Sequence, residues 1–194
     1  MYIIGASGHA RVIIDTLESL GIQIEGIYDK DVSISTCLDY PVNSMEDFLP
    51  GQDKVLIIAI GNNGWRKRLV LEYDQKVRWG TILHPAAIVS KYADIGQGTA
   101  IMAGAVIQAN AKIGNHSIIN TKASVDHDCT VGDFSLIAPG VTLCGGAKVG
   151  SGCLIGAGAT LIPGVDVGDN CYIGAGSTVL RNVSAGEKVF GIVK

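Results

Sequence analysis

The stretch IMAGAVIQANAKIGNHSIINTKASVDHDCTVG, residues 101–132, decides the fold of this chain. A large aliphatic residue recurs in it at every sixth position, from Ile101 to Val131. The same step, followed in both directions, gives seventeen positions that are all Ile, Leu or Val: Leu83, Val89, Ile95, Ile101, Ile107, Ile113, Ile119, Val125, Val131, Ile137, Leu143, Val149, Ile155, Leu161, Val167, Ile173 and Val179. Because these residue types make up about 28% of the chain, the probability of such a run by chance is on the order of 10⁻¹⁰.

A second column lies two positions before each aliphatic and holds mainly small side chains, among them Ala105, Ala111 and Ser117. A strict period of six fits neither a helix nor an alternating strand, but it fits one short strand and one sharp corner per hexapeptide. We expect three hexapeptides to close a coil, so that each aliphatic stacks about 4.8 Å from the residue eighteen positions earlier. The repeat from Leu83 to Val179 then gives roughly five and a half coils.

This pattern resembles that of the hexapeptide-repeat acyltransferases over residues 83–183. The resemblance implies a left-handed parallel β-helix, although the usual rule for parallel crossovers favours the right hand. It also implies that the chain assembles as a homotrimer. Cys129, Cys153 and Cys171 fall in the small inward column, which favours a role as compact apolar fillers.

Residues 1–80 have a different pattern and are expected to form an α/β domain, followed by a β-helix domain at residues 81–194. MYIIGASGHARVIIDTLESLG at the N-terminus predicts a strand, a glycine turn and a helix with Val12, Ile13, Leu17 and Leu20 on one face.

IEGIYDK, residues 24–30, predicts a second strand, and KVLIIAIGNNGWRKRLVLEY, residues 54–73, predicts a third strand, a turn and a helix. The segment between them, with Pro41 and Pro50, is expected to be a crossover. Strands that alternate with helices predict a small parallel sheet with a ligand site at the carboxyl ends of its strands.

Charge and composition exclude several classes of protein. The formal net charge is −3 and no run of Lys or Arg occurs, so neither nucleic acid nor an anionic membrane is an expected partner. No stretch approaches eighteen uninterrupted apolar residues, and residues 1–9 do not resemble a signal peptide, so we expect a cytoplasmic protein. The five cysteines include no C-x-x-C pair, which predicts reduced thiols and no metal site.

The glycine turn GASGHA contains Gly5 and Gly8 but lacks the full dinucleotide fingerprint. Asp29 follows at the distance of a ribose-binding acid, so a nicotinamide-dependent enzyme is one alternative. Eighty residues supply only one mononucleotide half, however, which suits a single nucleotide better. The two glycines are also explained by a tight strand-to-helix turn alone. In GNNGWRKR the turn precedes a helix, and Arg66 offers a fork suited to phosphate.

Taken together, IIGASGHARVIID, AIGNN followed by Arg66, HPAAIVS and NTKASVDHDCTVGDFS resemble the sialic acid O-acetyltransferase family, which includes N-acetyltransferases of nucleotide-linked 4-amino sugars in the bacillosamine and perosamine pathways. The resemblance implies that the N-terminal domain holds the nucleotide of the sugar substrate, and that acetyl-CoA is a co-substrate lying along the β-helix between subunits, with no tightly bound cofactor. The implied nucleotide-sugar residues are Gly5, Ser7, Gly8, His9, Asp29, Lys30, Gly61, Asn62 and Arg66.

His127 lies two places past an inward aliphatic and two before Cys129, so it is expected on a corner, pointing outward. The resemblance makes His127 the catalytic base and Asp128 its partner. An amine that attacks a thioester must lose a proton, and imidazole has an unperturbed pKa near the working pH. Asp126 is a candidate for supporting the site, for binding substrate or merely for solvating the corner. A metal site at these three residues is not expected, since neighbours on one corner cannot all turn toward one ion.

Gly145 lies eighteen residues beyond His127 and is expected to stack over it. By the resemblance its backbone N–H stabilises the oxyanion, and its alternative is an ordinary corner glycine. Asn120 matches a family position near the acceptor sugar, or else only forms a turn. Some relatives carry a second active-site histidine where this chain has Leu136, which leaves open any contact of that histidine to the thioester. The common ending G-V-P-A-K is FGIVK here, which leaves open the contacts of the tail to CoA.

His84 and His116 are expected to be structural and solvated, respectively. Three functions remain open at this point: N-acetylation of a nucleotide-linked 4-amino-4,6-dideoxy sugar by acetyl-CoA, O-acetylation of sialic acid, and a trimeric scaffold without catalytic activity that binds sugar nucleotides.

Overall fold

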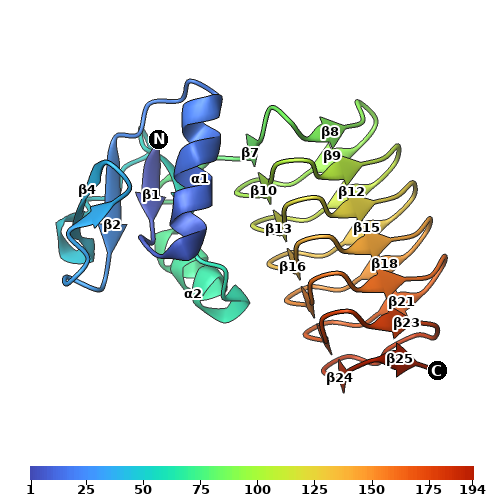
Figure 1. The fold of residues 1–194 in the computed structure, drawn as a ribbon. Coiled ribbons are helices and arrows are strands. Elements are labelled where there is room, and N and C mark those ends of the chain that lie inside the picture. The colour runs from blue at the N-terminus through green and yellow to red at the C-terminus, as the bar shows by residue number, and fades with distance from the viewer.

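The computed structural model describes residues 1–194 as an α/β domain beside a three-sided column of coils (Figure 1). The α/β domain holds a six-stranded sheet in the order β3-β4-β2-β1-β5-β6. All neighbouring strands are parallel except β3 and β4. The strands are β1 (Tyr2–Ile4), β2 (Gly26–Asp29), β3 (Thr36–Cys37), β4 (Tyr40–Ser44), β5 (Val55–Ile58) and β6 (Arg78–Trp79).

Two helices cover opposite faces of this sheet. Helix α1 (Gly8–Ser19) buries Ala10, Ile13, Ile14 and Leu17, whereas α2 (Asn63–Tyr73) packs on the other face, beside the short 3₁₀ helix η1 (Met45–Asp47). The predicted strands and helices are therefore present. The predicted apolar face of α1 is partly wrong, because Val12 and Leu20 are each 38% exposed.

The predicted crossover is also more structured than expected. It contains the hairpin of β3 and β4, and β4 extends the parallel sheet by pairing with β2. Pro41 lies inside β4, next to Val42, whose N–H donates to the carbonyl oxygen of Ser35.

The second part of the chain is a left-handed parallel β-helix of hexapeptide repeats, as predicted. Its two-residue strands form three parallel sheets. The first face holds β7 (Ile82–Leu83), β10 (Ala100–Ile101), β13 (Ile118–Ile119), β16 (Leu136–Ile137), β19 (Leu154–Ile155), β22 (Tyr172–Ile173) and β24 (Lys188–Val189). The second face holds β8 (Ile88–Val89), β11 (Val106–Ile107), β14 (Ser124–Val125), β17 (Thr142–Leu143), β20 (Thr160–Leu161), β23 (Thr178–Val179) and β25 (Ile192–Val193). The third face holds β9 (Asp94–Ile95), β12 (Lys112–Ile113), β15 (Thr130–Val131), β18 (Lys148–Val149) and β21 (Asp166–Val167).

The register confirms the period of six. Ile101 pairs with Ile119, and Ile119 with Ile137, so each coil takes eighteen residues. The predicted aliphatics fill one continuous core with the small column, and those of the first coil, Leu83 and Val89 among them, are partly exposed.

The column is longer than the aliphatic repeat predicts. Strands β24 and β25 extend the first two faces beyond Val179, but Ile173 pairs with Val189 and Val179 with Val193. These last pairings span sixteen and fourteen residues instead of eighteen, so the count in sixes stops before them. The unusual ending FGIVK contains β25.

One corner of the column carries a ladder of hydroxyl groups. Ser117 Oγ donates to the carbonyl oxygen of Gly132 and accepts from the N–H of Ser135. Ser135 Oγ in turn donates to the carbonyl oxygen of Gly150 and accepts from the N–H of Cys153. The small column at this corner therefore supplies hydrogen bonds as well as a close fit.

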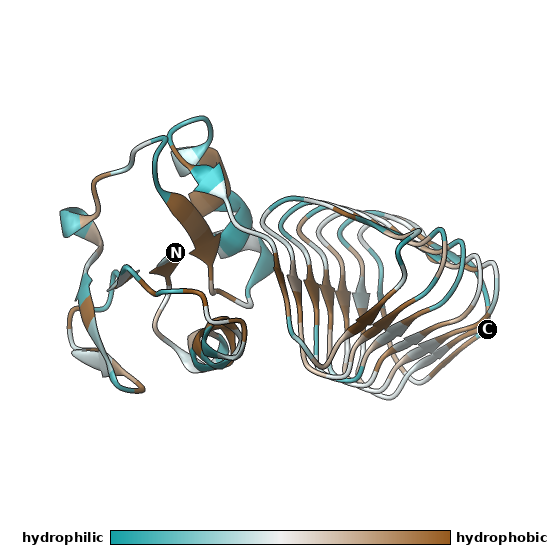
Figure 2. Cartoon of the chain, turned by 90° about the horizontal axis from the view of Figure 1, so that it is seen from above, coloured by the Kyte–Doolittle hydropathy of each residue, from teal (hydrophilic) through white to brown (hydrophobic).

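The three faces differ in the side chains that alternate outward. On the first face most are apolar, on the second they are aliphatic or small hydroxyl residues, and on the third Asp94, Lys112, Lys148 and Asp166 are charged and exposed. Figure 2 shows hydrophobic strands on the side of the column that faces the α/β domain. There α1 packs on the first coils, because Ile82, Ala100 and Met102 belong to the same buried cluster as Ile13 and Leu17. Neither helix has the length and apolar character needed to cross a membrane.

Candidate active site

His127 lies on the corner between the second and third faces and points away from the core, as predicted. Its side chain is 62% exposed, and its Nδ1 lies 2.8 Å from Asp128 Oδ2. Asp126 Oδ1 accepts a hydrogen bond from the backbone N–H of His127 at 2.7 Å. The two aspartates therefore have different roles. Asp128 fixes the imidazole ring, whereas Asp126 fixes the backbone of the corner.

The carboxylate of Asp128 is held by two side chains, those of His127 and Asn110. The residue has φ of 59°, a left-handed conformation that a sharp corner requires and that Asp tolerates better than most residues. Its Oδ1 accepts a hydrogen bond from Asn110 Nδ2 at 3.2 Å, one coil below. Sequence reasoning missed Asn110, although the spacing of eighteen residues from Asp128 identifies it.

The two aspartates raise the pKa of His127 above its usual 6.5, with the hydrogen bond to Asp128 as the largest cause and the charge of Asp126 as the next. The same hydrogen bond lowers the pKa of Asp128. A carboxylate on Nδ1 holds the neutral ring in the tautomer whose Nε2 has a free lone pair. Nε2 is then the atom that can accept a proton.

Gly145 stacks over His127, as the spacing predicts. The N–H of Gly146 donates to the carbonyl oxygen of His127 at 2.9 Å, which fixes the register of the two corners. A Cβ at Gly145 would lie 2.7 Å from both Cε1 and Nε2 of His127. Glycine at this position therefore leaves open the space beside Nε2 that a reacting group needs.

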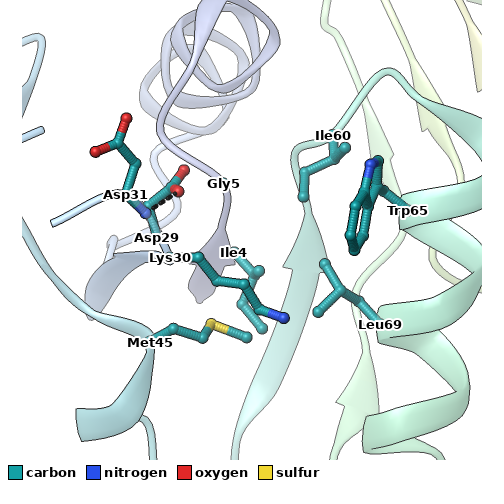
Figure 3. Close-up of a pocket in the computed structure, with 9 residues that line it drawn as sticks. All are labelled: Ile4, Gly5, Asp29, Lys30, Asp31, Met45, Ile60, Trp65 and Leu69. Carbon is teal, nitrogen blue, oxygen red and sulfur yellow. Dashed lines mark hydrogen bonds between the residues drawn. The ribbon is translucent and has the colours of Figure 1, made fainter. Parts of the chain in front are cut away.

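The α/β domain has a pocket of about 270 Å³ at the carboxyl ends of β1, β2 and β5 (Figure 3). Its lining residues are Ile4, Gly5, Asp29, Lys30, Asp31, Met45, Ile60, Trp65 and Leu69. Trp65 is 51% exposed, and Lys30 Nζ lies 6.0 Å from the centre of its ring. The pocket thus joins an aromatic face and apolar walls to one ammonium group and two carboxylates.

Comparisons with known proteins agree with both parts of the structure. Residues 1–73 match the model of the PglD N-terminal domain, and residues 146–181 match that of the bacterial transferase hexapeptide repeat. A solved structure of a single-residue mutant of perosamine N-acetyltransferase from Caulobacter crescentus, in complex with CoA and GDP-perosamine, is 36% identical, with a TM-score of 0.89 over 98% of this chain and 92% of that one. The chain belongs to the hexapeptide-repeat sugar acyltransferases.

Other structures similar to this acyltransferase support the same assignment. The acetyltransferase domain of PglB from Neisseria gonorrhoeae FA1090, solved with acetyl coenzyme A, is 32% identical, with a TM-score of 0.91 over 98% of this chain and 95% of that one. WeeI from Acinetobacter baumannii AYE is 26% identical, with a TM-score of 0.76 over the same shares. A search of curated proteins gave no match. The resemblance inferred from the motifs is thereby confirmed, and so is the class of enzyme.

Three of the nine residues predicted in the α/β domain of the acyltransferase line the pocket: Gly5, Asp29 and Lys30. Gly5 has φ of +105°, and a Cβ there would lie 2.9 Å from the carbonyl oxygen of Ala59. Asp29 accepts from the N–H of Ala6 through Oδ2 and from that of Asp31 through Oδ1. The carboxylate therefore holds the glycine turn against the end of β2.

Four further predicted residues shape the turns around the pocket. Ser7 is the N-cap of α1 with no hydrogen bond from its side chain to the helix, and Gly8 is the first helical residue. Asn62 caps α2, accepting from the N–H of Trp65 at 3.0 Å. The carbonyl oxygen of Gly61 accepts from Arg66 Nη1.

Arg66 corrects the sequence analysis. The expected phosphate fork is 1% exposed, and all its N–H groups point at protein oxygens. Nε, Nη1 and Nη2 donate to four backbone carbonyls, those of Ile60, Gly61, His116 and Phe134, and to Asn63 Oδ1. A guanidinium with no free donor cannot hold a phosphate.

Of the three histidines outside the corner, His116 is buried, whereas His9 and His84 are partly exposed. His116 is 4% exposed, stacks on Phe134 at 5.4 Å and meets Trp79 edge-on, which corrects the expectation of a solvated corner. His9 lies outside the pocket with Nε2 buried and unpaired. Burial and the charge of Arg66 lower the pKa of both histidines to about 4, so both are neutral near pH 7. His84 has a structural contact, since its Nδ1 accepts from the N–H of Ala86.

Asn120 does not lie at the corner that carries His127. It follows β13, at the corner between the first and second faces, and its Oδ1 accepts from the N–H of Thr121 at 2.8 Å. Leu136 begins β16 on the first face. Six residues that line the pocket were not predicted: Ile4, Asp31, Met45, Ile60, Trp65 and Leu69. A tryptophan in the exposed first turn of a helix is the signal that identifies Trp65.

Proposed function

We propose that this enzyme transfers an acetyl group from acetyl-CoA to the amine of a nucleotide-linked 4-amino-4,6-dideoxy sugar, with His127 as general base. The observation that carries the proposal is the exposed pair of His127 and Asp128, with the open side of Gly145 next to Nε2. The similarity to enzymes solved with CoA, acetyl coenzyme A and GDP-perosamine supports the choice of both substrates.

The amine attacks the thioester carbonyl carbon and forms the new C–N bond while His127 Nε2 takes the proton that the nitrogen loses. Asp128 stabilises the imidazolium that results, because it already holds Nδ1. The negative charge on the carbonyl oxygen is stabilised by the backbone N–H of Gly145. When the C–S bond breaks, the imidazolium returns its proton to the departing thiolate of CoA.

The pocket of the α/β domain is the proposed site of the nucleotide. Trp65 offers a face for stacking a base, and Lys30 offers a charge for the diphosphate. Gly5, Asp29, Ser7, Gly8 and Asn62 position the loops around that site. His9, Gly61 and Asn120 remain candidates for contacts to the sugar.

A homotrimer is the proposed assembly. The outward side chains of the second face are uncharged along the whole column, whereas those of the third face are mostly charged. Uncharged faces suit contact between subunits, and the charged face suits solvent. His127, at the edge between these two faces, then lies at the rim of the interface.

A panel of UDP-, GDP- and dTDP-linked amino sugars, each assayed for CoA release from acetyl-CoA, tests this function. We expect turnover with 4-amino sugars of one nucleotide, and none with the matching sugar that has a 4-hydroxyl group. Release of CoA with sialic acid, but with no amino sugar, would instead establish O-acetylation. Failure to bind CoA at all would leave only the scaffold without activity.

A further inference from the structure

The guanidinium of Arg66 joins the first turn of α2 to the β-helix through hydrogen bonds. Nε donates to the carbonyl oxygen of His116 at 2.7 Å, and Nη2 donates to that of Phe134 at 2.9 Å. These acceptors are 50 and 68 residues away in sequence and belong to the β-helix, whereas the other acceptors of Arg66 belong to its own domain. The side chain therefore bridges the two domains.

Asn63 makes a second bridge from the same turn. Its Nδ2 donates to the carbonyl oxygens of Gly152 and Cys153, at 3.1 and 2.8 Å. Its Oδ1 accepts from Arg66 Nη2 at 2.7 Å, so the two side chains act as one unit.

The acceptors of this unit form a regular row. His116, Phe134 and Gly152 are spaced by eighteen residues and occupy the same corner of three successive coils, between the third and first faces. The helix thus contacts three consecutive coils, which fixes both its height along the column and its angle to it. A single contact would leave the helix free to pivot.

The same turn also forms part of the nucleotide pocket. Trp65, which lines the pocket, lies between Asn63 and Arg66, and the carbonyl oxygen of Ile60, another lining residue, accepts from Arg66 Nη1 at 2.9 Å. Any change in how the turn sits on the corner must therefore move the pocket relative to the β-helix that carries His127.

We infer that Asn63 and Arg66 are positioning residues for acetyl transfer, which hold the nucleotide pocket at the height on the column where a bound amino sugar reaches His127 of a neighbouring subunit in the proposed trimer. The inference rests on the proposed function. Neither side chain touches the reacting atoms, and their effect is on orientation. Displacing bound reactants by about 1 Å can cost up to about 100-fold in rate, so the expected effect is large.

Asn63→Asp is the sharpest test. Aspartate keeps an oxygen for Arg66 and suits the N-terminus of α2, but it loses the N–H groups that reach Gly152 and Cys153. We expect kcat for the amino sugar to fall about tenfold or more. The dissociation constant of the free nucleotide, UDP, GDP or dTDP as the sugar panel selects, should stay within about threefold, because the pocket itself is intact.

Arg66→Lys provides a second variant, and Arg78→Lys is the matched control. Lysine keeps the charge of Arg66 but cannot donate to carbonyl oxygens on two coils, so the same fall in kcat is expected. Because Arg66 also donates to Ile60, which lines the pocket, nucleotide affinity is compared in the Asn63→Asp protein alone. Arg78 bonds only within the α/β domain, to the carbonyl oxygen of Asp53, and its variant should keep wild-type kcat. A lower unfolding temperature with unchanged kcat in Asn63→Asp would mean that the bridge is only structural, and would overturn the inference.

Hydrogen–deuterium exchange separates this inference from the proposed function. If the bridge holds α2 on the column, the backbone amides of the first turns of α2 should exchange faster in the Asn63→Asp protein than in the wild type. Unchanged exchange would contradict the docking role even if the enzyme proved inactive on every sugar. Wild-type inactivity on the whole panel, with faster exchange in the variant, would refute the function alone.

Discussion

At the scale of single residues, the pair of His127 and Asp128 makes the clearest prediction. His127→Ala should lower turnover by roughly 10²–10⁴-fold, the usual effect of losing a general base, while the oligomeric state persists. Steady-state assays with acetyl-CoA and size-exclusion chromatography measure the two properties. Unchanged turnover would remove His127 from the mechanism.

The pH profile tests how Asp128 acts. Because the pKa of His127 is raised above 6.5, the base is protonated and inactive below that pKa, and kcat/KM should rise with pH through a midpoint above 6.5. Asp128→Asn removes the largest cause of the shift, so the midpoint should move to lower pH while the maximum rate falls. A midpoint that does not move would show that another group controls the profile, since the substrate amine titrates equally in both proteins.

Gly145→Ala tests the open side of the imidazole. The added Cβ would lie 2.7 Å from Nε2, so the ring must move and turnover should fall about tenfold or more. The corner itself should tolerate alanine, since Ala109 occupies the same corner one coil below His127. The unfolding temperature should therefore stay close to that of the wild type. Full activity of the Gly145→Ala protein would show that the site does not require the space left by a glycine at this position.

The site residues that could be predicted are those whose positions follow from the spacing of eighteen residues per coil. Eighteen-residue arithmetic placed Gly145 over His127, and applied to Asp128 it also gives Asn110. Arg66 was mispredicted for a physical reason: charge and position beside a helix N-terminus suggest phosphate, but they do not reveal carbonyls 50 and 68 residues away.

At the scale of elements, the hydroxyl ladder predicts a specific loss of stability. Ser135→Ala removes the donor to the carbonyl oxygen of Gly150, in a partly buried bond, and the acceptor of the N–H of Cys153, in a buried one. We expect the free energy of unfolding to fall by about 1–3 kcal/mol. Denaturant titration measures it, with Cys153→Ser as the control, since serine already fills two positions of this column and preserves the bond to Gly168.

The strands of the column were predictable because each hexapeptide repeats the same pattern, a large aliphatic residue preceded two positions earlier by a small one. The last coil was not, since its shorter spacing moves Val189 and Val193 out of the count in sixes. In the α/β domain, the alternation of apolar strand segments with helical segments predicted the main strands and both helices. The hairpin of β3 and β4 was not predicted, because its residues have no strong apolar pattern. The buried face of α1 differs from the predicted one because that helix packs against both the sheet and the first coils of the column.

At the scale of the whole molecule, the contrast between the faces predicts how subunits meet. Thr160→Lys places a charge on the second face, and burying that charge without a partner should dissociate the proposed trimer. Lys148→Thr on the third face is the control, because its ion pair with Asp166, 3.6 Å long, is exposed and contributes little. Light scattering gives the molar mass, and a Thr160→Lys protein that keeps a trimeric mass would place the interface elsewhere.

The relation between the two domains was beyond sequence reasoning. Neither the burial of His116 against Trp79 and Phe134 nor the bridge from α2 follows from any local pattern, because each depends on surfaces that meet only after both domains have folded. The repeat predicts a column and the alternation predicts a sheet, but nothing in either predicts the angle between them.

The stacking of the coils also bears on how such an enzyme can change over time. Each coil contacts only the one above and the one below, and Asn110, His127 and Gly145 occupy three consecutive coils. Whole coils gained or lost nearer the C-terminus would therefore leave the catalytic geometry intact. The column is modular, so its length can vary among descendants of one ancestral gene while the chemistry is inherited unchanged.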